Sequence, residues 1–273
     1  MPLLEDEFGD IVRKARVGRG LSIEQVAAET GIDARKIADF EAYRSRPDKG
    51  DCDSLARTLG LGTSALWEAA EEAYVPMDVE IPADLEIVRF VFDGMNSNGY
   101  LVHVKAAPAT FIVDPGGDPA EMLATLAERD WSLSAILLTH GHSDHIEGLE
   151  RVRTRHDVPV YADAREWRGT GLRDIAGQSS LDVDGARVGI LSSPGHTRAG
   201  VVFTWNGAAA VGDTLFAGSL GGALGGPEYF ERLLASARAI VSLPPETVLL
   251  PGHGPLTTVR EQLAHNPFLA VGA

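Results

Sequence analysis

The sequence lacks most features of secreted, membrane-spanning or nucleic-acid-coating proteins. It has a single cysteine, Cys52, among 273 residues, so no internal disulfide can form. The absence of disulfides fits a reducing compartment, and we expect the Cys52 side chain to be a small, buried packing residue. No run approaches the ~20 apolar residues that span a bilayer, and the acidic segment 1–10 has no apolar core of the kind found in secretory signals. We therefore expect a cytoplasmic protein without membrane contact.

Positive charge is also scarce. The chain has 24 lysines and arginines against 39 aspartates and glutamates, which gives a formal net charge of −15. This balance argues against a broad basic surface for nucleic acid or anionic membranes. With 44% hydrophobic residues the chain can build a sizeable core, and its length allows one large domain or two smaller ones.

The most informative stretch present is Thr139–His145, which reads THGHSDH. Three imidazoles and one carboxylate follow directly after the short apolar run Ala135–Leu138, which is typical of a buried strand. Side chains that leave the end of a strand can converge on one point. Neutral imidazole nitrogens and carboxylate oxygens suit zinc, manganese and iron. The stretch therefore predicts a metal site.

Three further candidate ligands lie downstream at glycine-marked turns. They are His196 in SPGHT, Asp213 in VGDT and His253 in LLPGHG. Each follows a strand-like segment, and the neighbouring glycine lets the backbone approach closely at a sharp turn. One histidine beside a glycine would be weak evidence, but five histidines and two aspartates in this pattern are a strong joint signal.

These motifs over residues 85–270 resemble the metallo-β-lactamase superfamily, and GDTLFAGS, PGHGPLTT and NPFL resemble its glyoxalase II-like branch. The resemblance implies an α/β fold, the αββα sandwich. It also implies that His140, His142 and His196 bind one metal, that Asp144, His145 and His253 bind a second, and that Asp213 bridges both. We expect two divalent ions, with zinc favoured and iron or manganese as alternatives.

Two ions ~3.5–4 Å apart can hold a hydroxide between them, because bound metal lowers the pKa of water from ~15.7 toward ~7. No Ser-His-Asp arrangement is then needed. Asp144 is the catalytic candidate, since it could orient the attacking water or hand a proton to the leaving group. We expect hydrolysis of a thioester or a similar small ester by a glyoxalase II-like enzyme.

Three residues near these motifs are candidates for supporting the ligands or for contacting substrate. Asp114 follows a strand and either holds a ligand histidine or caps a turn. Arg198 stands where many relatives have proline and could attract an anionic substrate. Gly222 stands where relatives often carry an arginine. The sequence also lacks the helical C-terminal domain with which glyoxalase II holds glutathione, so the thiol portion of the substrate stays open.

Residues 1–72 have no strand alternation and predict short helices. Ser22 and Gln25 form a capping box, Asp33 caps the next helix, and a polar loop is expected at 44–53. The spacing around Thr30-Gly31-Ile32 resembles an Xre/Cro-type helix-turn-helix domain. We expect a small all-α domain at 1–72, a linker at 73–84, and the metallo-β-lactamase-like catalytic domain at 85–273.

The resemblance implies DNA contacts through Arg35, Lys36, Arg44 and Arg46. Residues 1–75, however, hold ten basic and fifteen acidic residues, and an acidic module binds phosphates weakly. Dimerisation, or docking on the catalytic domain, is the equally weighted alternative. If the module binds DNA, two-fold symmetry would favour a homodimer.

From Leu85 onward the pattern predicts two similar halves of strands and helices. Strands are expected at 85–92, 100–104, 111–113, 135–138, 158–161, 188–191, 201–205, 208–211 and 247–250, and helices at 118–129, 146–155 and 228–241. His103, His156 and His265 match no ligand motif and are expected to be surface or packing residues.

Three other functions remain open. A persulfide dioxygenase would hold one iron through His140, His196 and Asp213. A lactonase or phosphodiesterase would use the same fold for a different bond. A transcriptional regulator would use the hydrolase-like domain only to sense a ligand, although such a sensor has no need of all seven metal-binding groups.

Overall fold

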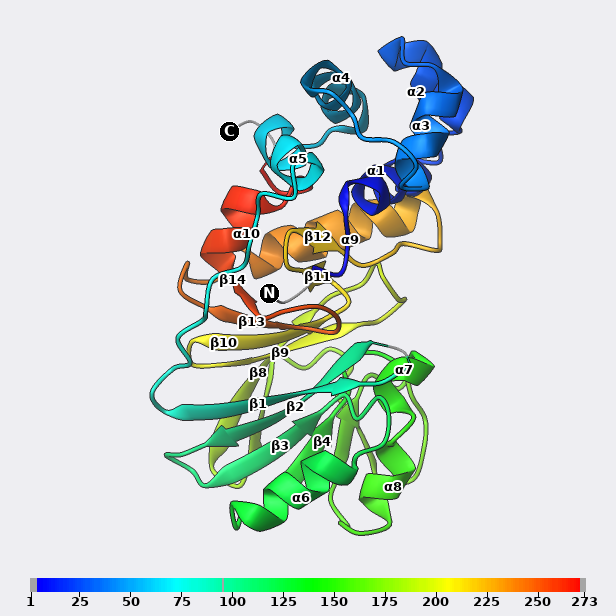
Figure 1. Cartoon of the computed structure of the whole chain (residues 1–273). Helices are drawn as coiled ribbons and strands as arrows, with labels where there is room; N and C mark the ends of the chain where they lie inside the picture. The colour runs from blue at the N-terminus through cyan, green and yellow to red at the C-terminus, as the bar shows by residue number, and fades with distance from the viewer. Residues whose placement is uncertain (1–3, 95, 271–273) are drawn as a thin grey trace.

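The computed structural model describes residues 4–94 and 96–270. Two six-stranded sheets face each other with helices on both outer sides, and a helical module covers one of these sides (Figure 1). The first sheet has the order β1 (Leu85–Phe92), β2 (Ser97–Val104), β3 (Ala109–Val113), β4 (Leu133–Leu137), β5 (Val160–Ala162) and β6 (Leu172–Asp174). The second has the order β14 (Thr257–Thr258), β13 (Val248–Pro251), β10 (Ala208–Gly212), β9 (Val201–Trp205), β8 (Ala186–Ser192) and β7 (Ser180–Val183). The predicted αββα fold is confirmed.

Strand periodicity explains why both faces of each sheet are apolar. In β4, Ala135 and Leu137 face the second sheet, whereas Ile136 packs in the cluster under the outer helices. In β10, Ala210 lies between the sheets and Ala209 faces the opposite side. Successive side chains of a strand point to opposite faces, so a continuous apolar strand requires cover on both sides.

The outer layers consist of short helices. The first sheet is covered by α6 (Ala120–Glu128), α7 (Ser143–Ile146) and α8 (Leu149–Arg153). The second is covered by α9 (Pro227–Ile240), which contributes Phe230, Leu233 and Ile240 to the core, with α10 (Val259–His265) beside it (Figure 1). A two-stranded hairpin, β11 (Leu215–Phe216) and β12 (Ser219–Leu220), lies between β10 and α9 in the chain.

The N-terminal module has five helices: α1 (Phe8–Gly18), α2 (Ile23–Thr30), α3 (Ala34–Glu41), α4 (Lys49–Leu59) and α5 (Thr63–Ala70). The predicted caps are confirmed, with a reciprocal Ser22–Gln25 capping box on α2 and an Asp33 cap on α3. The expected loop at 44–53 was wrong in its second half. Asp48 forms a capping box with Asp51, so α4 begins at Lys49.

This module docks on the αββα sandwich through a continuous apolar core. Ile11, Val12 and Leu59 belong to the same buried cluster as Phe230 of α9. The contact is close, because a Cβ built on Gly18 would lie 2.4 Å from the Phe230 ring. Domain boundaries at 72 and 84 stay predictions, since this shared core crosses them.

The predicted helix at 146–155 was wrong in its bounds. The chain forms α7 and α8 instead, separated at Glu147–Gly148. The reason is close packing, because the Gly148 amide donates to Pro115 O at 2.8 Å and a Cβ at Gly148 would lie 2.1 Å from Gly117 O. The short strands β6, β7, β11, β12 and β14 and the helix α10 were not predicted. A Thr258–Glu261 capping box, readable as T-x-x-E, marks the start of α10.

Cys52 is fully buried, and burial raises the pKa of its thiol to about 12. His103 stacks on Trp131, and His265 stacks on Tyr74. Among the described residues, no helix is long and apolar enough to cross a membrane.

Candidate metal centre

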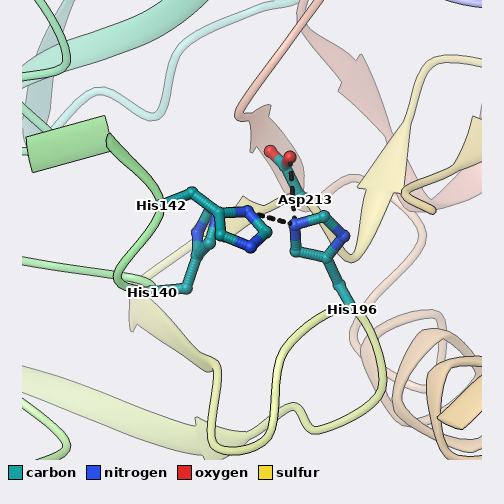
Figure 2. Close-up of side chains that lie close together, drawn as sticks. All are labelled: His140, His142, His196 and Asp213. Carbon is teal, nitrogen blue, oxygen red and sulfur yellow. Dashed lines mark hydrogen bonds and ion pairs between the residues drawn. The ribbon is translucent and has the colours of Figure 1, made fainter. Parts of the chain in front are cut away.

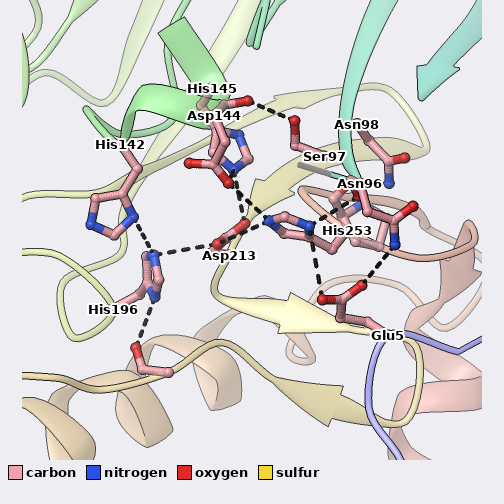
Figure 3. Close-up of polar contacts among 12 residues, drawn as sticks. Glu5, Asn96, Ser97, Asn98, His142, Asp144, His145, His196, Asp213 and His253 are labelled. Carbon is pink, nitrogen blue, oxygen red and sulfur yellow. Dashed lines mark hydrogen bonds and ion pairs between the residues drawn. The ribbon is translucent and has the colours of Figure 1, made fainter. Parts of the chain in front are cut away.

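All seven predicted ligands lie at one end of the sandwich. β3 and β4 are parallel, as are β10 and β13, so the loops that follow them leave the same edge of the two sheets. The side chains form two groups whose ligand atoms lie within 4.8 Å of one another: His140, His142, His196 and Asp213 in the first, and Asp144, His145 and His253 in the second (Figures 2 and 3).

Asp213 lies between the two groups. Its Oδ2 is 3.3 Å from His196 Nε2, and its Oδ1 is 3.3 Å from His145 Nε2. Oδ2 also lies 3.6 Å from His253 Nε2. One carboxylate therefore faces histidines of both groups, which is the arrangement that a ligand shared by two cations requires.

Asp114 orients His145 directly and His140 through Thr139. Its Oδ2 accepts from His145 Nδ1 at 3.1 Å and from the Thr139 hydroxyl at 2.5 Å, and its Oδ1 accepts from Thr139 N at 2.8 Å. The Thr139 hydroxyl accepts in turn from His140 Nδ1 at 3.0 Å. Asp114 also lies near enough to His140 and His145 to form a third ion-holding group. Because protein donors already occupy both of its oxygens, we assign it to holding ligands rather than an ion.

Backbone carbonyls orient two further rings. His196 Nδ1 donates to Gly222 O at 2.8 Å, and His253 Nδ1 donates to Asn96 O at 3.0 Å. These bonds make each Nδ1 the donor, so that the neutral form of either ring presents the lone pair of its Nε2 to the centre. Gly222 thus contributes through its carbonyl, and a side chain at this position would meet open space.

His142 presents its Nδ1, rather than its Nε2, to the other two rings of the group. Its Nδ1 lies 3.2 Å from His140 Nε2 and 2.9 Å from His196 Nε2 (Figure 2). The Nδ1 atoms of His140 and His196 already donate elsewhere, so both Nε2 atoms are acceptors in the neutral rings, and the single hydrogen of His142 Nδ1 can satisfy only one of them. A cation at their meeting point would satisfy all three nitrogens.

Two buried polar atoms without a hydrogen-bond partner in the described part of the chain show whether these candidate ligands fit a metal ion. His145 Nε2 and Asp213 Oδ1 are buried and have no hydrogen-bond partner among the described residues. Both point toward the shared centre, and burying an unpaired polar atom costs about 1–3 kcal/mol. A divalent ion would satisfy them, so the residues fit the expected cofactor.

The pKa values agree with this assignment. Burial lowers the pKa of His140 and His196, which keeps both rings neutral. The hydrogen bond with His253 lowers the pKa of Asp144 to about 2. Burial would raise the pKa of Asp213, but His145 more than reverses this and holds the carboxyl ionised. The centre thus presents lone pairs and negative charge.

Burial opposes the charged forms of His145 and His253, but their carboxylate partners outweigh it. The hydrogen bond to Asp114 and the nearby negative charge of Asp213 raise the pKa of His145 well above its usual value, and the contact with Asp144 raises that of His253. A metal ion that binds these two rings would displace their protons.

Close backbone approach explains one of the glycines in the motifs. A Cβ built on Gly252 would lie 2.0 Å from Asp213 Oδ1 and 2.7 Å from His145 Cε1. Any side chain there would enter the ligand cluster, so PGHG needs glycine before its histidine.

Sequence reasoning missed the residues that join the two sheets at the site. Asn98 Nδ2 donates to Pro251 O at 3.0 Å and to Gly254 O at 2.8 Å, and the Tyr100 hydroxyl donates to Pro251 O at 2.6 Å. Ser97 Oγ donates to Asp144 O at 2.7 Å. The sequence did offer one signal for these contacts, because the polar residues Ser97 and Asn98 stand at the start of an otherwise apolar strand.

Two missed glutamates touch the ligand loops. Glu166 accepts from Gly141 N at 3.3 Å and from Ala199 N at 2.6 Å, so it joins the first ligand loop to the one that carries His196. Glu5 comes from the N-terminal end and lies beside His253 (Figure 3). Their positions in the sequence give no indication of either contact.

Other predicted residues lie away from the centre. Arg198 is exposed and forms no ion pair with a described residue. Lys36 pairs with Asp51 at 2.7 Å, Arg44 pairs with Asp39 at 2.7 Å, and Arg46 pairs with Glu72. Arg35 is exposed at the start of α3. Three of the four predicted DNA-contacting cations therefore already have carboxylate partners.

Comparison with known proteins agrees with the fold and the motifs. A family model described as the metallo-β-lactamase superfamily matches residues 93–253, and a helix-turn-helix domain model matches residues 7–69. A probable metallo-hydrolase, YqgX of Bacillus subtilis, is 34% identical over 58% of this chain and 86% of its own length. A hydroxyacylglutathione hydrolase of Halorhodospira halophila is 34% identical over 58% of this chain, which spans only 62% of that protein.

Solved structures give the same result. The B3 metallo-β-lactamase BLEG-1 has a TM-score of 0.62 at 28% identity and aligns over 67% of this chain and 99% of its own. TTHA1623, solved in a di-iron-bound form, has a TM-score of 0.57 at 30% identity and aligns over 67% of this chain and 100% of its own. The chain belongs to the metallo-β-lactamase superfamily and carries an N-terminal helix-turn-helix domain.

Proposed function

We propose that the chain is a metal-dependent hydrolase that binds two divalent cations and cleaves a thioester or a similar small ester. The observation that carries this proposal is the position of Asp213, whose carboxylate faces histidines of both ligand groups at 3.3 Å. His140, His142 and His196 would hold one ion, Asp144, His145 and His253 the other, and Asp213 both. Such ions lower the pKa of water toward ~7 and polarise a carbonyl.

Asp144 is more open to water than the ligands beside it. Its side chain is 21% exposed, whereas those of His145 and Asp213 are 0% and 7% exposed. Its Oδ2 lies 3.3 Å from His253 Nε2, and its low pKa keeps it ionised at neutral pH. We infer that Asp144 accepts a hydrogen bond from the attacking water and orients it, rather than acting as an acid toward the leaving group.

The relatives support a thioester substrate without fixing its thiol. Several are named hydroxyacylglutathione hydrolases, and this chain spans about six-tenths of their length. Gly222 also leaves open space where relatives often carry an arginine. We therefore propose thioester cleavage as the reaction class and expect a thiol other than glutathione to be accepted.

Zinc is the proposed metal, since imidazole and carboxylate ligands suit it. Iron is the alternative because similar ligands accept both metals and the relative TTHA1623 was solved with two irons. A single iron per chain would favour the alternative function, a persulfide dioxygenase. The intact Asp144, His145 and His253 group favours a two-metal hydrolase over that reaction.

The test is elemental analysis of protein purified without added metal, combined with thioester assays. We expect two zinc ions per chain and hydrolysis of a simple acyl thioester, with S-lactoylglutathione as the comparison substrate. Asp213→Asn is the matched control, because it keeps the shape of the side chain and removes its charge. One iron per chain with oxygen uptake on a persulfide would overturn the proposal. Activity confined to lactones or phosphodiesters would overturn the substrate class.

For the helix-turn-helix domain we propose docking on the catalytic domain as the main role. The shared core with α9 supports docking, and the ion pairs of Lys36, Arg44 and Arg46 argue against free phosphate-binding cations. A gel-shift titration at low salt against the gene's upstream region tests this. Salt-dependent, sequence-specific binding would restore the DNA function.

A further inference from the structure

The segment Leu4–Glu7, here the N-terminal strap, lies against the loop that carries His253 (Figure 3). A Cβ built on Gly254 would lie 3.3 Å from Glu5 N, so the two backbones are in close contact. Glu5 Oε1 is 3.9 Å from His253 Nδ1, and Oε2 accepts from Asn96 Nδ2 at 3.4 Å. The strap thus places a carboxylate beside the second ligand group.

The strap is fixed in position by a buried charge. Asp6 is only 7% exposed, pairs with Lys14 of α1, and accepts from Ser219 Oγ at 2.6 Å. Lys14 also donates to Leu220 O at 2.7 Å. Ser219 and Leu220 form β12, which follows Asp213 closely in the chain. The helical module is therefore joined through this strap to the segment that follows the bridging ligand.

Glu5 remains accessible to a ligand. Its side chain is 26% exposed, and its one ion-pair contact with a described residue is the distant one to His253. No described lysine or arginine forms an ion pair with it, and Lys14 acts on its charge only from a greater distance. A negative charge at this point would repel an anionic group that approaches the His253 edge and would attract a cationic one.

We propose that Glu5 is a specificity-determining residue, through which the helix-turn-helix module selects against anionic groups in the ligand beside His253. Ligands that place an ammonium group or a hydrogen-bond donor there bind better than ligands with a carboxylate. This inference rests on the proposed function, because it requires a ligand bound at the metal centre. Under this proposal, the N-terminal module lines part of the catalytic site.

The test compares two small thiols that differ in charge. Cobalt-substituted protein is titrated at about pH 8, well above the usual carboxyl range, with cysteamine and with 3-mercaptopropionate, and binding is followed in the visible spectrum. In Glu5→Gln we expect mercaptopropionate to bind about threefold more tightly and cysteamine about threefold more weakly, as expected for one partly screened charge. Glu5→Lys should shift both affinities further in the same directions.

Two controls isolate the charge of Glu5. Glu128→Gln removes an equal charge from an exposed position at the end of α6, on the outer face of the first sheet, and should leave both affinities unchanged, whereas Glu5→Asp should retain the preference. An unchanged cysteamine-to-mercaptopropionate ratio in Glu5→Gln and Glu5→Lys overturns the inference. A shifted ratio without hydrolysis of any thioester overturns only the proposed function. Failure to bind cobalt overturns both.

Discussion

The two ligand groups of the metal centre are supported by different parts of the chain. His196 is held by Gly222 from the same domain, and its neighbours are His140 and His142. His253 is held by Asn96 from the β1–β2 loop and lies beside Glu5 of the N-terminal strap. The first group is thus surrounded by the catalytic domain alone, whereas the second also has Glu5 of the N-terminal strap beside it.

Because the two groups have different surroundings, metal binding and substrate selection should depend on different parts of the chain. The positions of the ligand atoms follow from strand ends that the sandwich brings together. The surroundings of His253 follow from where the helical module docks. We therefore expect changes in the module to alter the second group and its ligands before they alter the first.

The largest effect should come from Asp213→Asn, because this carboxylate faces both groups. We expect loss of both ions and a fall in kcat/KM of at least about a thousandfold, equal to about 4 kcal/mol. Metal content and thioester kinetics measure the change. Retention of two ions with normal activity would show that the two groups do not share a ligand.

Phe230→Ala should loosen the module from α9. Phe230 is 2% exposed and packs against Gly18 and Phe268, so the cavity left behind should cost about 3–5 kcal/mol of unfolding free energy. Urea unfolding measures it, with exposed Ala235→Gln on the same helix as control. If the two variants are equally stable, the module does not share its core with the catalytic domain.

Asp114→Asn should weaken the second group more than the first. The substitution removes the negative charge that accepts from His145 and Thr139, which should cost about 10- to 100-fold in metal affinity. Competition with a chelator should release one ion well before the other. Equal loss of both would mean that Asp114 supports the two groups alike through Thr139 and His140.

The smallest effect should come from Arg35→Ala. Since the other predicted DNA-contacting cations are paired with carboxylates, we expect duplex DNA to bind with a Kd weaker than about 10 μM at physiological salt. The substitution should change this by less than about twofold. Fluorescence anisotropy measures both values. Tight binding that Arg35→Ala abolishes would reassign α3 as a DNA-reading helix.

Much of the fold could be predicted because its signals are local. The Ser22–Gln25 capping box and the Asp33 cap are short-range hydrogen bonds, and alternation predicted β1 directly. The boundary between α7 and α8 could not be predicted, because it depends on Gly148 packing against Gly117, which lies in a distant loop.

The sequence by itself predicted which seven side chains gather at one place, because imidazole and carboxylate groups after apolar strands form a pattern that needs no knowledge of distant contacts. It also determined the family and the two kinds of domain. Only the tertiary structure decided that Asp114 orients His145, that Gly222 acts through its carbonyl, and that Glu5 reaches the site. These contacts join residues separated by 26 to 248 positions, and such pairs meet only after the sheets and the helical module have packed.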